Sequence, residues 1–269
     1  MEISWHAIET VPRYPYPWRV REFFECMPEA LNGEPPTPVP TGLDPAERFD
    51  LVIIGWQVWF LSPSLPIQAF FTAAEAVVLR GTRVISVTCC REICQRAQAR
   101  MRMLIRQTGG VLTDSIVLTH QGGSMVGYLT APRLMLSGRR EAGALLPAAG
   151  VAQHDIDGLA RFGVRLRETQ NRWAEAEPGS LLADLAPTDV NTSALLPEMI
   201  GAAVMTLFAR VARRCGRPGG LLRLPVIGVF MLALVILLPV VLAVSALLTP
   251  VLRILLPSRF PRRTANAPG

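Results

Sequence analysis

Short aliphatic runs alternate with amphipathic stretches through the middle of the chain. Residues 49–55 form a continuous apolar run, as in a strand that is buried on both faces of a parallel sheet, and residues 82–88 and 111–119 fit a second and a third strand. Stretches that fit helices follow the runs: residues 66–80, 91–107 and 155–173. This order predicts an α/β domain built on a doubly wound parallel sheet, with the ligand site at the carboxyl ends of the strands.

The N-terminal residues are less regular. Alternating apolar and polar side chains predict a short strand over residues 1–8. A proline-rich segment follows, with a helix expected near residues 19–31. The aromatic side chains of Tyr14, Tyr16 and Trp18 are expected to cover a sheet edge or to lie on a membrane surface.

The C-terminal part contains an uncharged aliphatic run, residues 224–252. As a helix with a rise of ~1.5 Å per residue it would be roughly 44 Å long, enough to cross a ~30 Å hydrocarbon layer once. Pro239 lies in the middle of the run. A proline inside a helix removes a hydrogen bond, so a shallow re-entrant hairpin is the alternative. We favour a single transmembrane helix that is tilted or kinked.

Arginines near the C-terminus supply much of the net charge of +6 at pH 7. Residues 210–263 contain nine arginines and no acidic residue, which suits anionic lipid head groups far better than nucleic acid. Just upstream, apolar residues recur along one face of a predicted helix: Ile200, Val204, Leu207, Phe208 and Val211. The pattern predicts a helix at the membrane interface, and a helix packed on its own domain is the alternative.

These features divide the chain into four parts. We expect an α/β domain in residues 1–175, a linker with a basic amphipathic helix in 176–221, a transmembrane anchor in 222–257 and a basic tail in 258–269. Arginines flank both ends of the anchor, so their distribution does not set its orientation. Because the first residues show no basic region followed by an apolar core, we expect the α/β domain on the cytoplasmic side of the inner membrane.

Several chemistries find no support in the sequence. No Ser/His/Asp order, Walker motif or carboxylate pair stands out, so hydrolase and phosphoryl-transfer functions are not indicated. The cysteines form no CxxC pair and no zinc spacing, so free thiols and no metal site are expected: Cys26, Cys89, Cys90, Cys94 and Cys215.

Candidate site residues lie where the three predicted strands end. They are Gly55, Trp56, Gln57, Val58 and Trp59 after the first strand, Cys89 and Cys90 at the end of the second, and His120 after the third. His120 begins a glycine-rich loop, residues 120–127, and is the candidate proton donor or acceptor.

Each candidate also has a structural interpretation. A tryptophan at a strand end often packs in a core, a thiol there is commonly buried and inert, and a histidine can be structural. Ser62 and Ser64 fit a cap of the helix that starts near Pro66. The arginines within residues 91–106 fit a solvated cationic face or a contact with phospholipid.

One stretch carries a family resemblance. The sequence DLVIIG at residues 50–55, then Val58 and Trp59, then SPSLP at residues 62–66, resembles the third strand and following loop of the flavodoxin and NAD(P)H-dependent FMN reductase superfamily. With PYPW, the HQGG loop and the hydrophobic anchor, the chain is similar to the membrane-anchored flavodoxin-like proteins labelled dialkylresorcinol condensing enzymes. Trp56 and Gln57 stand where the superfamily has a small residue and a proline.

The resemblance implies a flavodoxin-like fold that holds FMN through residues 55–59, Cys89 and Cys90. It further implies NAD(P)H as electron donor, contact with membrane lipid, a lipid-like substrate and a homodimer. The implied activity is an aromatising oxidation in dialkylresorcinol-type lipid biosynthesis. A second function stays open, a non-catalytic or truncated flavodoxin-like scaffold that binds a lipid intermediate or a partner enzyme through residues 56–66.

One part of the superfamily pattern is missing. Its members begin with a strand and a Ser/Thr/Gly-rich loop that holds the FMN phosphate at a helix N-terminus. Residues 1–8 of this chain correspond instead to the second strand. Because the first strand of this fold lies inside the sheet, we expect either a start upstream of Met1 or a truncated copy.

Overall fold

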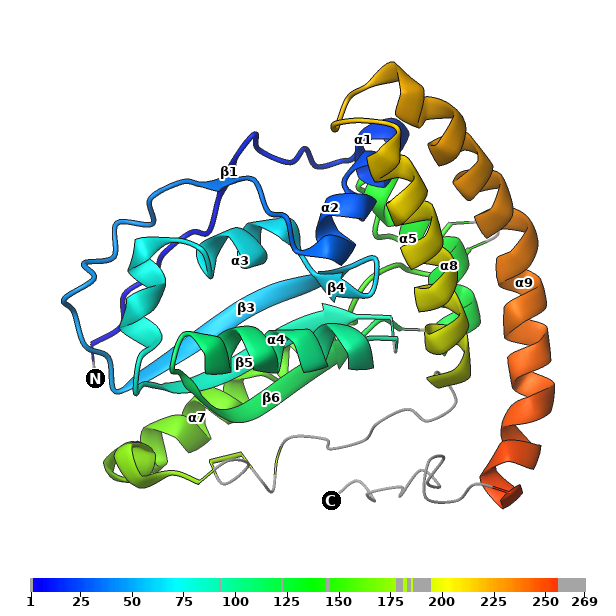
Figure 1. Ribbon diagram of the computed structural model, residues 1–269. Helices are drawn as coiled ribbons and strands as arrows, with labels where there is room; N and C mark the ends of the chain where they lie inside the picture. The colour runs from blue at the N-terminus through cyan, green and yellow to red at the C-terminus, as the bar shows by residue number, and fades with distance from the viewer. Residues whose placement is uncertain are drawn as a thin grey trace.

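A four-stranded sheet forms the centre of the molecule (Figure 1). The computed structural model describes residues 2–91, 93–121, 123–143, 146–177, 181–182, 185 and 195–255. The strands are β3 (Leu51–Trp59), β4 (Ser62–Pro63), β5 (Arg83–Cys90) and β6 (Val111–Thr119). Their order is β4-β3-β5-β6, with β3, β5 and β6 parallel and β4 antiparallel to the end of β3. The predicted α/β class with a parallel sheet is confirmed.

Helical segments cover both faces of the sheet, as the alternation of elements predicts. One face packs under α3 (Leu65–Phe70), the 3-10 helix η1 (Ala74–Leu79) and α4 (Gln95–Gln107). Its core joins Ile54 and Val84 of the sheet to Met101 and Ile105 of α4. The other face packs under α7 (Ala160–Glu168) and the 3-10 helix η2 (Gln170–Glu175), which follow the short helix α6 (Gln153–Asp157). Ile85 and Ile116 meet Phe162, Leu166 and Trp173 there.

The N-terminal segment departs from the prediction. Residues 2–9 form no strand, and the short strands β1 (Thr10–Val11) and β2 (Thr37–Pro38) pair only with each other. Ile3 and Trp5 are exposed. The alternation of apolar and polar residues does not form a strand here, because no neighbouring strand pairs with this segment. The expected helix near residues 19–31 is present as α1 (Val20–Glu25) and α2 (Met27–Asn32).

Two predicted boundaries after the strands are wrong. Strand β3 does not stop at Gly55 but continues to Trp59, because an exposed Gly55 and Gln57 alternate with a buried Trp56, as in a strand with one open face. The expected loop at residues 120–127 contains the start of α5 (Gly123–Ser137). Its glycine-rich beginning and its internal Pro132 hide a helical pattern.

The C-terminal helices form an antiparallel pair beside the α/β domain (Figure 1). They are α8 (Leu195–Arg214) and α9 (Leu224–Leu255), joined through the short 3-10 helix η4 (Leu221–Arg223). Helix α9 is one continuous helix through Pro239, not a re-entrant hairpin. Among the described residues, the stretch Leu221–Ser245 is long and apolar enough to cross a membrane. The predicted tail, residues 258–269, lies outside the described residues.

Helix α8 packs against the rest of the molecule through small residues. Ala202, Ala209 and Ala212 are buried, whereas Leu207 and Val211 remain exposed. The helix lies between α2 and α9. Helix α8 thus packs on its own domain. In its predicted apolar row Leu207 and Val211 face outward, whereas Phe208 is partly buried and its ring lies 5.1 Å from that of Phe230 in α9.

Candidate functional site

The predicted site residues of β3 and β5 fall on opposite faces of the sheet. Successive residues of a strand point to opposite faces, so Trp56 and Cys90 enter the core while Gly55, Gln57 and Cys89 are exposed. A side chain at Gly55 would meet no atom within 4 Å. The structure thus brings Gly55, Gln57 and Cys89 together on an open patch and separates them from Trp56.

Trp56 is fixed by packing and hydrogen bonds. Its ring lies in the core beneath α3 and α4, and Nε1 donates to Ser86 Oγ at 2.7 Å. The backbone carbonyl of Trp56 accepts a hydrogen bond from Thr88 Oγ1 at 3.1 Å. Stacking of this ring on a planar ligand would require the core to open.

Trp59 belongs to a separate aromatic cluster with the N-terminal segment. Its ring centroid lies 5.0 Å from that of Tyr14 and 5.1 Å from that of Trp18, both edge to face. Its Nε1 donates to Gln57 Oε1 at 3.3 Å. Val58 is partly buried and pairs with Pro63 of β4. Tyr14 and Trp18 therefore cover the end of β3, one of the two roles expected for them, and Tyr16 is exposed.

His120 lies beside the end of β5, where two arginines surround it. Its backbone N–H donates to the carbonyl of Cys90 at 3.0 Å. Within the described residues the buried Nδ1 atom has no hydrogen-bond partner. Burial, with the positive charges of Arg91 and Arg140, lowers the pKa of His120 to about 4. The imidazole is therefore neutral at pH 7 and a weaker base than an ordinary histidine.

The neighbouring thiols do not form an obvious nucleophile. Although the residue is exposed, the surrounding protein partly desolvates the Cys89 thiol and raises its pKa, against the opposing charge of Arg140. Cys90 and Cys94 are buried. A hydrogen bond from Cys90 lowers the pKa of Cys94, yet its burial keeps reactants away from the sulfur.

The N-terminus of α4 already holds an anionic group of the protein itself. The backbone N–H groups of Gln95 and Arg96 donate to the two carboxylate oxygens of Glu198 at 3.2 and 2.6 Å. Burial raises the pKa of Glu198, and these hydrogen bonds oppose the rise. This helix end, a common phosphate site in α/β proteins, is therefore occupied by the first turn of α8.

These contacts test whether the described residues fit FMN as the resemblance implies. Neither tryptophan ring is open to a ligand. Trp56 lies in the core, and Trp59, which borders the open patch through its hydrogen bond to Gln57, is buried in the aromatic cluster. The amide of Ser64, at the start of α3, donates to the carbonyl of Gln57 at 2.8 Å. The described residues do not provide the expected contacts for FMN.

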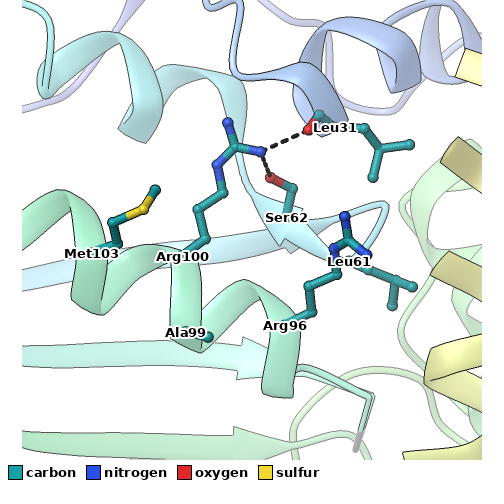
Figure 2. A pocket seen from close by; sticks show the side chains of 7 residues that line it. All are labelled: Leu31, Leu61, Ser62, Arg96, Ala99, Arg100 and Met103. Atoms are coloured by element: carbon teal, nitrogen blue, oxygen red, sulfur yellow. Dashed lines mark hydrogen bonds between the residues drawn. The ribbon is translucent and has the colours of Figure 1, made fainter. Parts of the chain in front are cut away.

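A second site lies beside α4, where the sequence predicted a solvated cationic face or a contact with phospholipid. A hollow of about 330 Å³ is bordered by α4, α2 and the β3–β4 turn (Figure 2). Its walls are Leu31, Leu61, Ser62, Arg96, Ala99, Arg100 and Met103. Arg96 and Arg100 were visible as neighbours on one helix face, but the elements that complete the hollow come from distant parts of the chain.

No family model, curated protein or solved structure matches this chain. Its class therefore rests on its own geometry. It is a mixed α/β protein with a parallel-containing sheet, and in the part of the chain that the structure describes the C-terminal helix α9 is long and apolar enough to span a membrane.

Proposed function

We propose that this protein is a membrane-tethered, flavodoxin-like module that binds a lipid-like ligand beside its β3–β4 turn, on the cytoplasmic side of the inner membrane. The observation that supports the proposal most strongly is the exposed aliphatic surface of α9 together with the buried contact at its base. This helix exposes aliphatic side chains over most of its surface, and the residue before it is locked into the α/β domain.

The exposed surface of α9 favours hydrocarbon over water. Leu232 and Val235 are 61% and 71% exposed, and a long run of such side chains in water is unfavourable. Arginines at the α8–α9 turn, such as Arg214 and Arg217, suit contact with anionic head groups at the entry to the bilayer.

The base of α9 is attached rigidly. Arg223 is 1% exposed and its Nη2 donates to Glu29 Oε1 at 2.7 Å, while its Nε donates to the carbonyl of Gly216 at 2.8 Å. Arg21 donates to the carbonyl of Gly219 at 3.0 Å. A tether clamped in this way holds the hollow at a fixed orientation to the lipid surface.

An FMN-dependent oxidoreductase in dialkylresorcinol-type lipid biosynthesis is the second candidate. The open patch of Gly55, Gln57 and Cys89 at the carboxyl end of the sheet, close to His120, favours it. The buried tryptophans and the occupied N-terminus of α4 count against it. We therefore place it behind the binding module.

Membrane extraction tests the tether. The full chain should stay in the membrane pellet after alkaline carbonate and high-salt washes. The double substitution Leu232→Arg and Val235→Arg should release much of it, since each arginine at the centre of a spanning helix costs ~2.5–3.5 kcal/mol. Leu207→Arg on α8, at a site that is 59% exposed, is the matched control and should remain in the pellet. Release of the wild-type chain by salt alone would contradict the tether.

Flavin titration decides between the two candidates. The detergent-purified chain should be colourless and should leave the fluorescence of added FMN unquenched. Stoichiometric FMN binding that Gly55→Val abolishes would instead support the oxidoreductase. That substitution adds a side chain where no atom lies within 4 Å, so it should not disturb the fold.

A further inference from the structure

Two arginines share the hollow beside α4. Arg96 and Arg100 are one turn apart on the helix, and both side chains extend towards the β3–β4 turn and α2 (Figure 2). The remaining walls are largely apolar, formed by Leu31, Leu61 and Met103 with Ala99. The hollow thus combines two positive charges with a hydrocarbon lining.

Arg100 is held in place by neighbouring backbone. Its Nη1 donates to the carbonyl of Leu31 at 2.7 Å and to Ser62 Oγ at 3.3 Å. Gly33 leaves room for it, because a Cβ atom there would lie 1.9 Å from Arg100 Nη2. Within the described residues Nε is buried without a partner and Nη2 makes no hydrogen bond. The guanidinium is therefore held in place by Nη1, and its other N–H groups are available to donate hydrogen bonds to a ligand.

The two charges lack a counterion among the described residues. Neither guanidinium makes an ion pair there. The carboxylate of Glu198, whose charge reaches Arg96, is engaged by the amides of α4. Burial, then repulsion from Arg96, lowers the pKa of Arg100. An anion bound between the two arginines would relieve this repulsion.

We propose that this hollow binds the anionic head of an amphiphile, a carboxylate or phosphate attached to an acyl chain. Its volume lies at the lower end of the ~300–1,000 Å³ typical of ligand sites, so it suits a head group and a short part of a chain. Leu61 lies close to Gly201 of α8, 3.8 Å from where a Cβ would stand. Leu61 therefore places the hollow next to α8. This inference rests on the proposed function, and it specifies that the lipid-like ligand of the module is an anionic amphiphile.

The test uses the full chain in mild, uncharged detergent with four probes. A fluorescent long-chain fatty acid and a lysophosphatidic acid carry the proposed heads, the methyl ester of the fatty acid is neutral, and inorganic phosphate has no chain. Both anionic amphiphiles should bind, whereas the methyl ester should bind about tenfold to a hundredfold more weakly, as expected for the loss of charge-assisted hydrogen bonds.

Variants locate the site. Arg96→Met should weaken binding of the anionic amphiphiles about tenfold or more, and its guanidinium makes no hydrogen bond within the described residues, so the fold should be unaffected. Arg100→Met should weaken binding at least as much, although it also removes contacts to α2. Arg102→Met, an exposed position of the same helix outside the hollow, is the control and should bind like the wild type.

The outcomes separate the inference from the proposed function. Equal binding of acid and methyl ester, unaffected by Arg96→Met, would overturn the anionic head but leave a lipid-binding module. Arginine-dependent binding of inorganic phosphate without any gain from the chain would overturn the amphiphile and indicate a free anion. Binding of no probe by a chain that still resists membrane extraction would overturn the site and leave the tether.

Discussion

Two arginines from distant parts of the chain hold the short helix α2, and they do so in different ways. Arg223, at the base of α9, is buried against the carboxylate of Glu29. Arg100, from α4, donates to the carbonyl of Leu31 in the last turn of α2 and lies beside a second arginine, Arg96. Both contacts hold α2 in place, but only the contact to Glu29 neutralises the charge of its arginine.

The difference separates a structural arginine from one that is available to a ligand. A buried charge is tolerated when it is paired, and the pair then leaves no electrostatic gain for another anion. Backbone carbonyls accept hydrogen bonds from Arg100 but carry only partial negative charge, so they do not neutralise its guanidinium. The comparison therefore predicts that loss of the first contact mainly lowers stability and that loss of the second lowers ligand binding as well.

The largest expected effect comes from unpairing Arg223. Glu29→Ala should lower the free energy of unfolding by about 3–5 kcal/mol, because it leaves a buried guanidinium without its carboxylate. Urea unfolding in mild detergent, followed by tryptophan fluorescence, measures the change. Glu34→Ala is the matched control, because Glu34 and Arg213 form an ion pair whose side chains are each 44% exposed. That change should cost no more than about 1 kcal/mol, and equal losses in the two variants would contradict the comparison.

The fold could be read from the sequence largely because its core strands are aliphatic and regularly spaced. The strand Val111–Thr119 coincides with its prediction, and α9 follows from an uncharged run. The prediction of an N-terminal strand was wrong. An alternation of apolar and polar residues shows which side chains would share a face of a strand, but it does not show whether a partner strand is present. Residues 56–59, which were expected to follow the first strand, belong to β3 instead, because Trp56 packs against α3 and Trp59 packs against the N-terminal segment.

The candidate site was less accessible to sequence reasoning. Arg96 and Arg100 looked like part of a solvated face, as charges spaced along a helix usually are. What distinguishes Arg100 is the approach of Leu31 and Ser62, which are far from it in sequence. Gly33 offers the one local signal, but a glycine after a helix reads first as an ordinary C-cap. Only the three-dimensional arrangement shows that it also makes space for a guanidinium.

The role of that space gives the second prediction. Gly33 and Gly42 have nearly equal backbone angles, φ of +75° and +78°, but only Gly33 faces Arg100. Alanine at either position should pay about 1–2 kcal/mol for the left-handed conformation. Gly33→Ala should cost about 1.5–3 kcal/mol more, because Arg100 must give up its charge-assisted hydrogen bonds. Chemical unfolding of the two variants measures the excess, and equal costs would show that Arg100 moves aside freely.

The smallest expected effect is a pH dependence at His120, beside a second pair of arginines. Burial and the charges of Arg91 and Arg140 lower the pKa of His120 from 6.5 to about 4. The unfolded chain therefore takes up this proton first as the pH falls, and the free energy of unfolding should decrease between about pH 6.5 and pH 4. Allowing for the partial exposure of the imidazole, the loss should be about 1–2 kcal/mol.

His120→Gln measures that contribution, because glutamine cannot titrate over this range. The variant should show a flatter dependence of the free energy of unfolding on pH than the wild type, with the difference confined to the interval from about pH 6.5 to pH 4. His154→Gln, at an exposed position, is the control and should follow the wild-type profile. If His120→Gln also follows it, the charges of Arg91 and Arg140 are screened at His120.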